Sequence, residues 1–154
     1  MTCYTRYSCP VGSLVLISDG TALTGLTFAE PDSLWEPMGN LSIFDSVIRW
    51  LDAYFAGKPM PVDLPLSPAG TDFQRRVWDI LLTIPYGETT TYGAIAKQLG
   101  APMSAQAVGQ AVGKNPLAII IPCHRVVGAN GQLTGYAWGI ERKQWLLRHE
   151  EETK

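Results

Sequence analysis

The sequence is poor in cysteine, has no long hydrophobic run and shows no strong excess of charge of either sign. Its three cysteines are an odd number in 154 residues, which argues against a disulfide-stapled secreted scaffold. The longest aliphatic stretches, residues 14–17 and 117–121, are far shorter than the ~20 residues that cross a bilayer. The first ten residues do not have the pattern of a secretory signal. We therefore expect a cytoplasmic protein with no membrane partner.

Histidine is scarce as well, since the chain contains only His124 and His149. A structural zinc site would need ligands gathered from both ends of the sequence, so we expect no metal ion. The net charge of −2 speaks mildly against a nucleic-acid partner, but the charge is unevenly distributed. Residues 1–70 hold three basic and seven acidic residues, whereas residues 71–154 hold nine basic and seven acidic ones. This asymmetry hints at a division of labour between the halves, although a solvated surface gives the same count.

What is present is a globular composition, with 46% hydrophobic and 17% charged residues, which excludes disordered and collagen-like classes. In the first half, short runs of strand-forming residues separated by turn signals predict an antiparallel meander, with Asp19-Gly20 as a hairpin turn. Apolar residues then recur at spacings of three and four, which is typical of an amphipathic helix. The expected strands cover residues 6–8, 13–18 and 22–29, and the expected helix covers residues 42–56.

Residues 58–70 contain four prolines and form the natural boundary between two domains, residues 1–69 and residues 70–154. The expected fold class is therefore α/β, of the α+β kind. A small N-terminal antiparallel sheet with a helix precedes a helical C-terminal domain.

The second domain carries the start signals of three helices. Thr71 and Gln74 make a capping box for the first helix, and Thr91 and Ser104 are suitable N-cap residues for the next two. The last two helices, over residues 92–99 and 104–114, are separated by a Gly100-Ala101-Pro102 break. Two helices joined by a short glycine-containing turn are the outline of a helix-turn-helix.

The helix over residues 104–114 is unusual because it contains two glycines, Gly109 and Gly113, among small side chains. Each glycine costs roughly 1 kcal/mol of helix stability relative to alanine. A surface of small residues lets another body approach closely. Two interpretations stand nearly level here, close packing against a neighbouring helix and insertion into a groove.

One cysteine, Cys123, lies in a sequence that favours a reactive thiol. It follows an aliphatic, strand-like run over residues 117–121 and Pro122, which suits the first position of a short helix. The helix dipole, His124 and Arg125 all favour the thiolate over a thiol whose ordinary pKa is ~8.5. The alternative is that Cys123 is a small core residue, as most free cysteines are.

His124 is the nearest possible base, but adjacent residues on a helix point apart, so it would act on the thiol through a bridging water. A base also needs an orienting partner, and the acids near the C-terminus are Glu141 and residues 150–152. The last expected helix covers residues 141–149, with Trp145, Leu146 and Leu147 supplying its apolar surface. A papain-like protease would need a histidine distant in sequence, and only His149 is left for that role.

The heptapeptide Ile121-Pro122-Cys123-His124-Arg125-Val126-Val127 resembles the active-site signature of the O6-alkylguanine-DNA alkyltransferase family. Ordered flanking motifs extend the resemblance across residues 70–150. They are Phe73-Gln74 to Trp78, Ile84 to Glu88, Thr91-Tyr92, Val108-Gly109, Lys114-Asn115-Pro116, Gly135-Tyr136 and Trp145 to Glu150. The N-terminal half matches only in length and in its strand and helix layout. The resemblance implies a ribonuclease-H-like first domain and a winged helix-turn-helix second domain that binds DNA and carries the catalytic cysteine.

The same resemblance implies direct-reversal DNA repair, in which an alkyl group moves from O6 of guanine in double-stranded DNA to the protein's own cysteine. A monomer would bind the minor groove and flip the damaged base out of the stack. No cofactor is implied. Because the thioether product has no good leaving group, the reaction would be irreversible and stoichiometric, with one transfer per molecule.

The resemblance also implies roles for individual residues. Cys123 would be the nucleophile, His124 would deprotonate it through a water, and Glu150 would orient the histidine. Asn115 would be the hinge between the recognition helix and the active-site segment, and Tyr92 would meet the flipped guanine and the neighbouring phosphate. The residues implied in binding the base or the DNA are Ala105, Gln106, Gly109, Arg125, Val126 (through its backbone), Tyr136, Ala137 and Trp138.

Two positions depart from the family pattern. Gln106 stands where the family usually has an arginine that replaces the extruded base in the stack, so we expect less assistance to extrusion. Ala137 stands where some relatives have a side-chain donor to guanine, a contact that the backbone could replace. Two other classes stay open: an alkyltransferase-like protein that binds lesions without repair, disfavoured by Cys123, and a thiol hydrolase or redox protein, disfavoured by the lack of a resolving cysteine.

Overall fold

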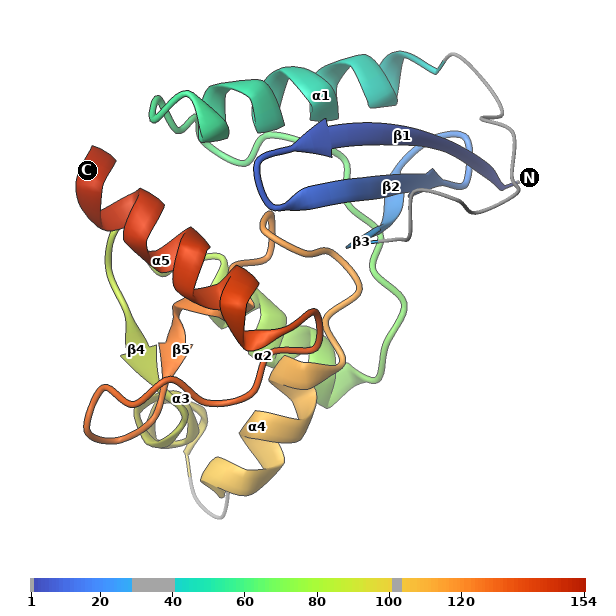
Figure 1. Ribbon diagram of the computed structural model, residues 1–154. Helices are drawn as coiled ribbons and strands as arrows, with labels where there is room; N and C mark the ends of the chain where they lie inside the picture. Colours follow the sequence, from blue (N-terminus) through green and yellow to red (C-terminus); the bar gives the residue numbers. More distant parts are fainter. Residues whose placement is uncertain (1, 29–40, 101–103) are drawn as a thin grey trace. The chain divides into compact units, whose positions relative to one another are not determined.

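The computed structural model of the chain describes residues 2–28, 41–100 and 104–154. The chain divides into two compact units (Figure 1). The first contains Met1–Ala69 together with Pro116–Ala118, and the second contains Gly70–Asn115 and Ile119–Lys154. Residues 116–118 thus belong to the first unit although they are distant in sequence from the rest of it. The single domain boundary expected near residue 70 does not describe this arrangement.

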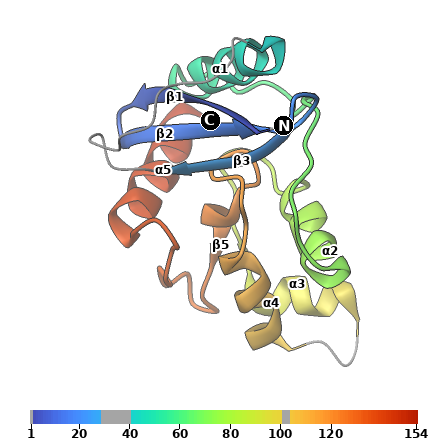
Figure 2. The same ribbon diagram turned by 90° about the vertical axis from the view of Figure 1, so that its right-hand side faces the viewer.

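The first unit is a three-stranded antiparallel sheet with one helix running alongside it (Figures 1 and 2). Its strands are β1 (Cys3–Cys9), β2 (Gly12–Ser18) and β3 (Leu23–Phe28), in the order β1-β2-β3, and its helix is α1 (Ser42–Phe55). The predicted meander and helix are confirmed. Leucines of the central strand and the helix, Leu14, Leu16 and Leu51, are fully buried and form the core of this unit.

Residues 117–121, predicted as a strand, pair at only one position. Leu117 forms an isolated parallel bridge with Leu26 of β3, in which the Leu26 N–H donates to the Pro116 carbonyl at 2.9 Å. Residues 118–120 are a turn, and Ile119 has a φ of 70°, which is rare for a β-branched residue. The run is apolar because it is buried, and burial alone does not distinguish a strand from a buried turn.

The second unit contains four helices, which are α2 (Asp72–Leu81), α3 (Tyr92–Leu99), α4 (Ala105–Gly113) and α5 (Ile140–Thr153), among its described residues. Three begin at the predicted caps, since Thr71, Thr91 and Ser104 each accept a backbone N–H three residues ahead. The reciprocal bond from the Thr71 N–H to Gln74 completes the capping box. Most of the predicted Gly100 to Pro102 break lies outside the described residues.

Helix α4 packs on α2 through one buried tryptophan. The Trp78 indole N–H donates to the Ala111 carbonyl of α4 at 2.9 Å, and Val108 and Ala111 face inward with it. The glycines of α4 play no part in this packing. A Cβ at Gly113 would meet nothing within 4 Å, and one at Gly109 would make an ordinary 3.6 Å contact with the Tyr92 ring. Packing against a neighbouring helix therefore explains neither glycine.

The segment between α4 and α5 contains a short 3-10 helix, η1 (Cys123–Arg125), and a two-residue strand, β5 (Val126–Val127). Strand β5 pairs in parallel with β4 (Thr90–Thr91), which immediately precedes α3. This pairing fixes the start of α3 beside the residues that follow Cys123.

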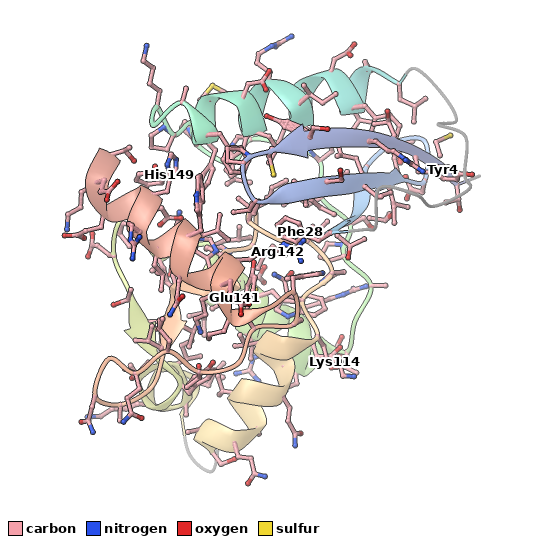
Figure 3. The ribbon with its side chains drawn as sticks, viewed as in Figure 1. Tyr4, Phe28, Lys114, Glu141, Arg142 and His149 are labelled. Atoms are coloured by element: carbon pink, nitrogen blue, oxygen red, sulfur yellow. The ribbon has the colours of Figure 1, made fainter. Side chains whose placement is uncertain are left out.

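Helix α5 is longer and less apolar on its inner face than the sequence predicted. Its buried residues are Lys143, Leu146 and Glu150, spaced by three and four along one face. Of the three expected apolar residues, only Leu146 is fully buried. The Trp145 ring stacks on His149, which Figure 3 shows on this helix, at a centroid distance of 4.9 Å. In the parts of the chain that the structure describes, no helix is long and apolar enough to span a membrane.

Candidate active site

Three consecutive side chains of η1 are buried together: Cys123, His124 and Arg125 are 4%, 0% and 8% exposed. The expectation that Pro122 occupies the first helical position is wrong, because Pro122 is the N-cap of a helix only three residues long. So short a helix adds little dipole at the thiol.

Burial dominates the electrostatics of Cys123. It raises the pKa of the thiol to about 11, against opposing effects of the Asn115 hydrogen bond and the Lys143 charge. The prediction that neighbouring groups enrich the thiolate is therefore wrong for the free protein, in which this sulfur is protonated at neutral pH. The reason is that desolvation of a buried anion outweighs the nearby charge.

His124 is held by Glu150 of α5. The distance from His124 Nε2 to Glu150 Oε2 is 2.5 Å, and both side chains are buried. The other ring nitrogen, Nδ1, is buried and has no hydrogen-bond partner among the described residues. An ionised carboxylate only accepts hydrogen bonds, so Nε2 carries the proton and Nδ1 keeps its lone pair.

Arg125 holds the other side of the same carboxylate. Its Nε donates to Glu150 Oε1 at 2.7 Å and its Nη2 donates to Oε2 at 3.1 Å. Its Nη1 donates to the Ile84 carbonyl at 2.7 Å, and the guanidinium lies 5.7 Å from the centre of the Tyr86 ring. Arg125 was expected to contact DNA or the base, yet its donors are engaged inside the protein.

The charges of this group decide its protonation. Burial pushes the pKa of Glu150 upward, but hydrogen bonds and charges from His124 and Arg125 hold it well below its usual range. Burial lowers the pKa of His124 despite the opposing effect of Glu150. The resting state is therefore an ionised Glu150 beside a neutral His124, which is the state a general base requires. Among the acids that the sequence left open, Glu150 is the one that contacts His124.

Asn115 connects the end of α4 to the segment before Cys123. It is 4% exposed, its Nδ2 donates to the Ile121 carbonyl at 2.8 Å, and its hydrogen bond lowers the pKa of the Cys123 thiol. Lys114, which precedes it, marks the C-terminal end of α4 in Figure 3. A side chain in this place ties the position of α4 to that of the cysteine.

Cys123 lines a small pocket together with residues from α3, α4 and the loop before α5. Its volume is about 40 Å³, and its walls include Tyr92, Gly109, Tyr136 and Ala137. Burial and the neighbouring Cys123 raise the pKa of Tyr136 well above its usual value, so its phenol stays protonated. A cavity of ~150 Å³ is needed to hold even benzene. The pocket is therefore too small for a purine in this conformation and has to widen to admit one.

Other predicted binding residues lie outside this pocket. Ala105 and Gln106 are exposed at the start of α4. Trp138 packs edge-on against Tyr136 with 5.3 Å between ring centres. Val126 is buried, and its carbonyl accepts a hydrogen bond from Lys143 Nζ at 2.6 Å.

Two residues of this region were not found from the sequence. Lys143 is fully buried, and its Nζ also donates to Thr134 Oγ1 at 3.2 Å. Thr134 Oγ1 in turn lies 2.6 Å from the Tyr92 hydroxyl. The sequence did contain a signal for Lys143, because its spacing from Leu146 and Glu150 places the three residues on one helix face. Lysine is mostly exposed in proteins, however, so this position was not expected to be buried. The described residues include no group of three that could hold a metal ion.

Residues 72–152 match the family model described as 6-O-methylguanine DNA methyltransferase, DNA binding domain. Residues 2–68 match the model of the ribonuclease-like domain of the same proteins. The chain belongs to the 6-O-methylguanine DNA methyltransferase family.

Relatives and solved structures of this family cover nearly the full length. A Mycobacterium tuberculosis (strain H37Rv) protein named methylated-DNA–protein-cysteine methyltransferase is 50% identical over 96% of this chain and 92% of its own length. A Methanosarcina acetivorans protein of the same name is 47% identical over 96% of this chain and 97% of its own. The crystal structure of M. tuberculosis O6-methylguanine methyltransferase superposes with a TM-score of 0.87 at 49% identity, covering 100% of this chain and 95% of that one. A crystal structure of the M. tuberculosis protein in complex with DNA matches equally well, with a TM-score of 0.87 at 50% identity over 97% and 93% of the two chains.

Proposed function

We propose that this protein repairs DNA directly, by transferring an alkyl group from O6 of guanine to its own Cys123 in a single, irreversible event. The observation that carries this function is a buried cysteine lining a pocket, next to a histidine whose Nε2 is fixed by Glu150. The family membership and the DNA complex of the M. tuberculosis relative support DNA as the partner.

Activation of the sulfur begins with the free lone pair of His124 Nδ1. Glu150 accepts the Nε2 proton and so keeps the imidazole in the tautomer that can take a second proton. A water bridging Nδ1 and the thiol carries the Cys123 proton to His124, because adjacent residues do not present their side chains to each other directly. The high pKa of the thiol keeps the sulfur protonated until His124 takes the proton.

The transfer itself is a displacement at the alkyl carbon. The Cys123 sulfur forms a bond to that carbon, and the bond from carbon to O6 breaks with its electron pair leaving on the purine. The proton held by His124 passes to the guanine, so the products are neutral guanine and a thioether. The substrate must be held against the sulfur for this step, because O6-alkylguanine is a weak electrophile.

DNA binding is assigned to the helix-turn-helix of the second unit. The outer surface of α4 includes the small residues Ala105 and Gly113, and a Cβ at Gly113 would meet nothing within 4 Å in the free protein. Such a surface suits close approach to the minor groove, and the damaged base is flipped out of the stack into the widened pocket. Gln106 then faces the space left by the base, and Asn115 couples α4 to the cysteine. One chain supplies all of these groups, so the protein acts as a monomer.

Several residues contact the flipped base in this proposal. Tyr92 and Tyr136 line the pocket beside Cys123, and Ala137 belongs to the same wall. The Val126 backbone reads the edge of the base, and Trp138 supports the Tyr136 ring. Arg125 contributes from inside, through Glu150, rather than by contact with DNA.

The experiment that tests this function is intact mass spectrometry after incubation with a duplex containing O6-methylguanine. We expect the mass of the protein to rise by one methyl group at Cys123, and we expect no gain in Cys123→Ser. A protein that binds the lesion while both partners keep their mass would instead be a lesion-recognition protein. Loss of the lesion with unmodified protein would indicate hydrolysis. Either of these results would overturn the proposal.

A further inference from the structure

Thr134, in the loop before α5, connects two residues on different elements of the second unit. Its Oγ1 lies 2.6 Å from the hydroxyl of Tyr92 at the start of α3 and accepts a hydrogen bond from Lys143 Nζ of α5 at 3.2 Å. The Lys143 Nζ is also fixed by the Val126 carbonyl at 2.6 Å. This chain of contacts is separate from the bonds of His124 with Glu150, and the mechanism above does not use it.

The chemistry of the three groups sets the direction of the hydrogen bonds. An ammonium group only donates, so Thr134 Oγ1 is the acceptor toward Lys143. A hydroxyl that accepts from a cation is polarised, and its own O–H becomes a better donor. Either hydroxyl of the Tyr92–Thr134 pair can be the donor, and polarisation by Lys143 favours Thr134 as the donor toward the Tyr92 oxygen. The Tyr92 proton is then left to donate to another group.

The surroundings of Tyr92 indicate where that proton points. Tyr92 lines the pocket that contains Cys123, and its ring lies 3.6 Å from where a Cβ on Gly109 of α4 would stand. Lys143 is fully buried and cannot turn to solvent, so its hydrogen bond fixes the Thr134 hydroxyl from the protein side. A phenol donor in the wall of this pocket lies where negative charge develops on the departing purine.

We propose, on the basis of the alkyl transfer described above, that Thr134 is a positioning residue which with Lys143 turns the Tyr92 hydroxyl toward the leaving guanine. As the bond from the alkyl carbon to O6 breaks, the electron pair passes to the purine, and the Tyr92 O–H donates a hydrogen bond to it. Tyr92 keeps its proton throughout, and the proton that neutralises the guanine is the one taken from Cys123 by His124. Thr134 acts only through Tyr92.

The test compares Thr134→Val, which keeps the shape but removes the hydroxyl, with Thr134→Ser, which keeps it. Loss of a preorganised donor costs 10²–10³ in rate, and a donor retained but badly oriented costs less. We expect Thr134→Val to slow single-turnover methyl transfer about tenfold, with DNA affinity unchanged, and Thr134→Ser to react like the parent. Thr134→Ala repeats the measurement if the valine variant does not fold.

A double-mutant cycle with Tyr92→Phe separates positioning from a structural role. The Thr134→Val change should have no effect on the rate once the Tyr92 hydroxyl is absent, because there is nothing left to orient. Equal slowing in both backgrounds, or no slowing in either, would overturn the role of Thr134 while methylation of Cys123 in the parent upholds the proposed function. A parent that gains no methyl group would overturn both.

Discussion

Among single residues, Glu150 has the most demanding position, because its two oxygens accept hydrogen bonds from His124, Arg125 and the Gly87 N–H. Removing its charge leaves the Arg125 guanidinium buried without a counter-ion, which is among the costliest changes in a protein interior. The same change removes the group that fixes the tautomer of His124. Stability and chemistry therefore depend on one carboxylate.

We predict that Glu150→Gln lowers the free energy of unfolding by about 3–5 kcal/mol and abolishes methyl transfer. The matched control is Glu151→Gln, since Glu151 is exposed and its ion pair, at 2.9 Å, is with the exposed Lys154. That change should cost no more than about 0.5 kcal/mol. Urea unfolding of the two variants checks the first value, and equal stabilities would contradict the buried ion group.

The pH dependence of the reaction follows from His124. The imidazole must be neutral to accept the Cys123 proton, and burial lowers its pKa below the ordinary 6.5. The single-turnover rate should therefore hold its neutral-pH value as the pH falls through 6.5 and decline only in more acidic solution. Quenched-flow measurement of transfer between pH 5 and 8 tests this, and a rate that halves near pH 6.5 would show an unperturbed histidine.

How much of the site could be predicted varies from residue to residue. Cys123 and its neighbours stand in a contiguous motif, so sequence alone singled them out. The partner of His124 was ambiguous, because Glu141 and residues 150–152 all lie near the C-terminus and only the buried face of α5 distinguishes Glu150 from the others. Thr134 gave no local signal, and the spacing of Lys143 on the inner face of α5 was outweighed by the usual exposure of lysine. Their importance arises from contacts across 42 and 17 residues.

At the scale of elements, α4 is the helix whose composition is least explained by packing within its own unit. Its inner face of Val108, Ala111 and Val112 packs inside the unit. Gly113 has no such purpose, since it is exposed and a Cβ there would meet nothing within 4 Å in the free protein. Gly113 therefore lowers the stability of α4 at an exposed position, where a binding partner such as DNA can approach the helix closely.

We predict that Gly113→Ala makes the protein more stable by about 0.5–1 kcal/mol while weakening its binding to DNA. The stabilisation follows from the lower entropy cost of alanine in a helix, and the weaker binding from a methyl group between the helix and the groove. Thermal unfolding and fluorescence anisotropy with a short duplex measure the two effects. Tighter binding by the variant would argue against contact of this face with DNA.

Gln106 at the exposed start of α4 allows a second test on the same helix. Glutamine can hydrogen-bond to the orphaned base, but it is shorter than arginine and uncharged. We expect Gln106→Arg to tighten DNA binding or to speed transfer from duplex substrate, and Gln106→Ala to slow it. If both variants react like the parent, Gln106 has no part in extrusion.

The elements also show which sequence signals were reliable. Thr71, Thr91 and Ser104 placed three helix starts correctly, because a cap bond joins residues only three apart. Residues 117–121 were wrongly expected to form a strand, since a fully buried apolar run has no alternation to reveal its backbone. Ile119 within this run has a positive φ, a conformation that nothing in the local sequence of a β-branched residue predicts.

At the scale of the whole molecule, the chain returns to its first unit at residues 116–118 before it reaches the cysteine. Leu117 and Ala118 are fully buried there, and Leu26 of β3 holds both ends of the bridge through the Pro116 carbonyl and the Ala118 N–H. Residues 116–118 are therefore part of the first unit although the sequence on both sides of them belongs to the second.

We predict that a fragment of residues 70–154 is less stable than the same residues in the full chain. Exposure of Leu117 alone should cost about 1.5–3 kcal/mol, since its partner strand is missing. Chemical denaturation of the fragment, with and without added residues 1–69, measures the effect. A fragment as stable as the intact chain would mean that the bridge to Leu26 contributes nothing.

A protein that reacts only once has to arrive at its target with its sulfur still intact. Peroxides and dissolved alkylating agents attack exposed thiolates. Cys123 is 4% exposed and the pKa of its thiol is about 11, so almost no exposed thiolate is present for these reagents to attack. The burial that makes Cys123 unreactive in the free protein thereby keeps each molecule competent for repair in a cell exposed to the chemicals that damage its DNA.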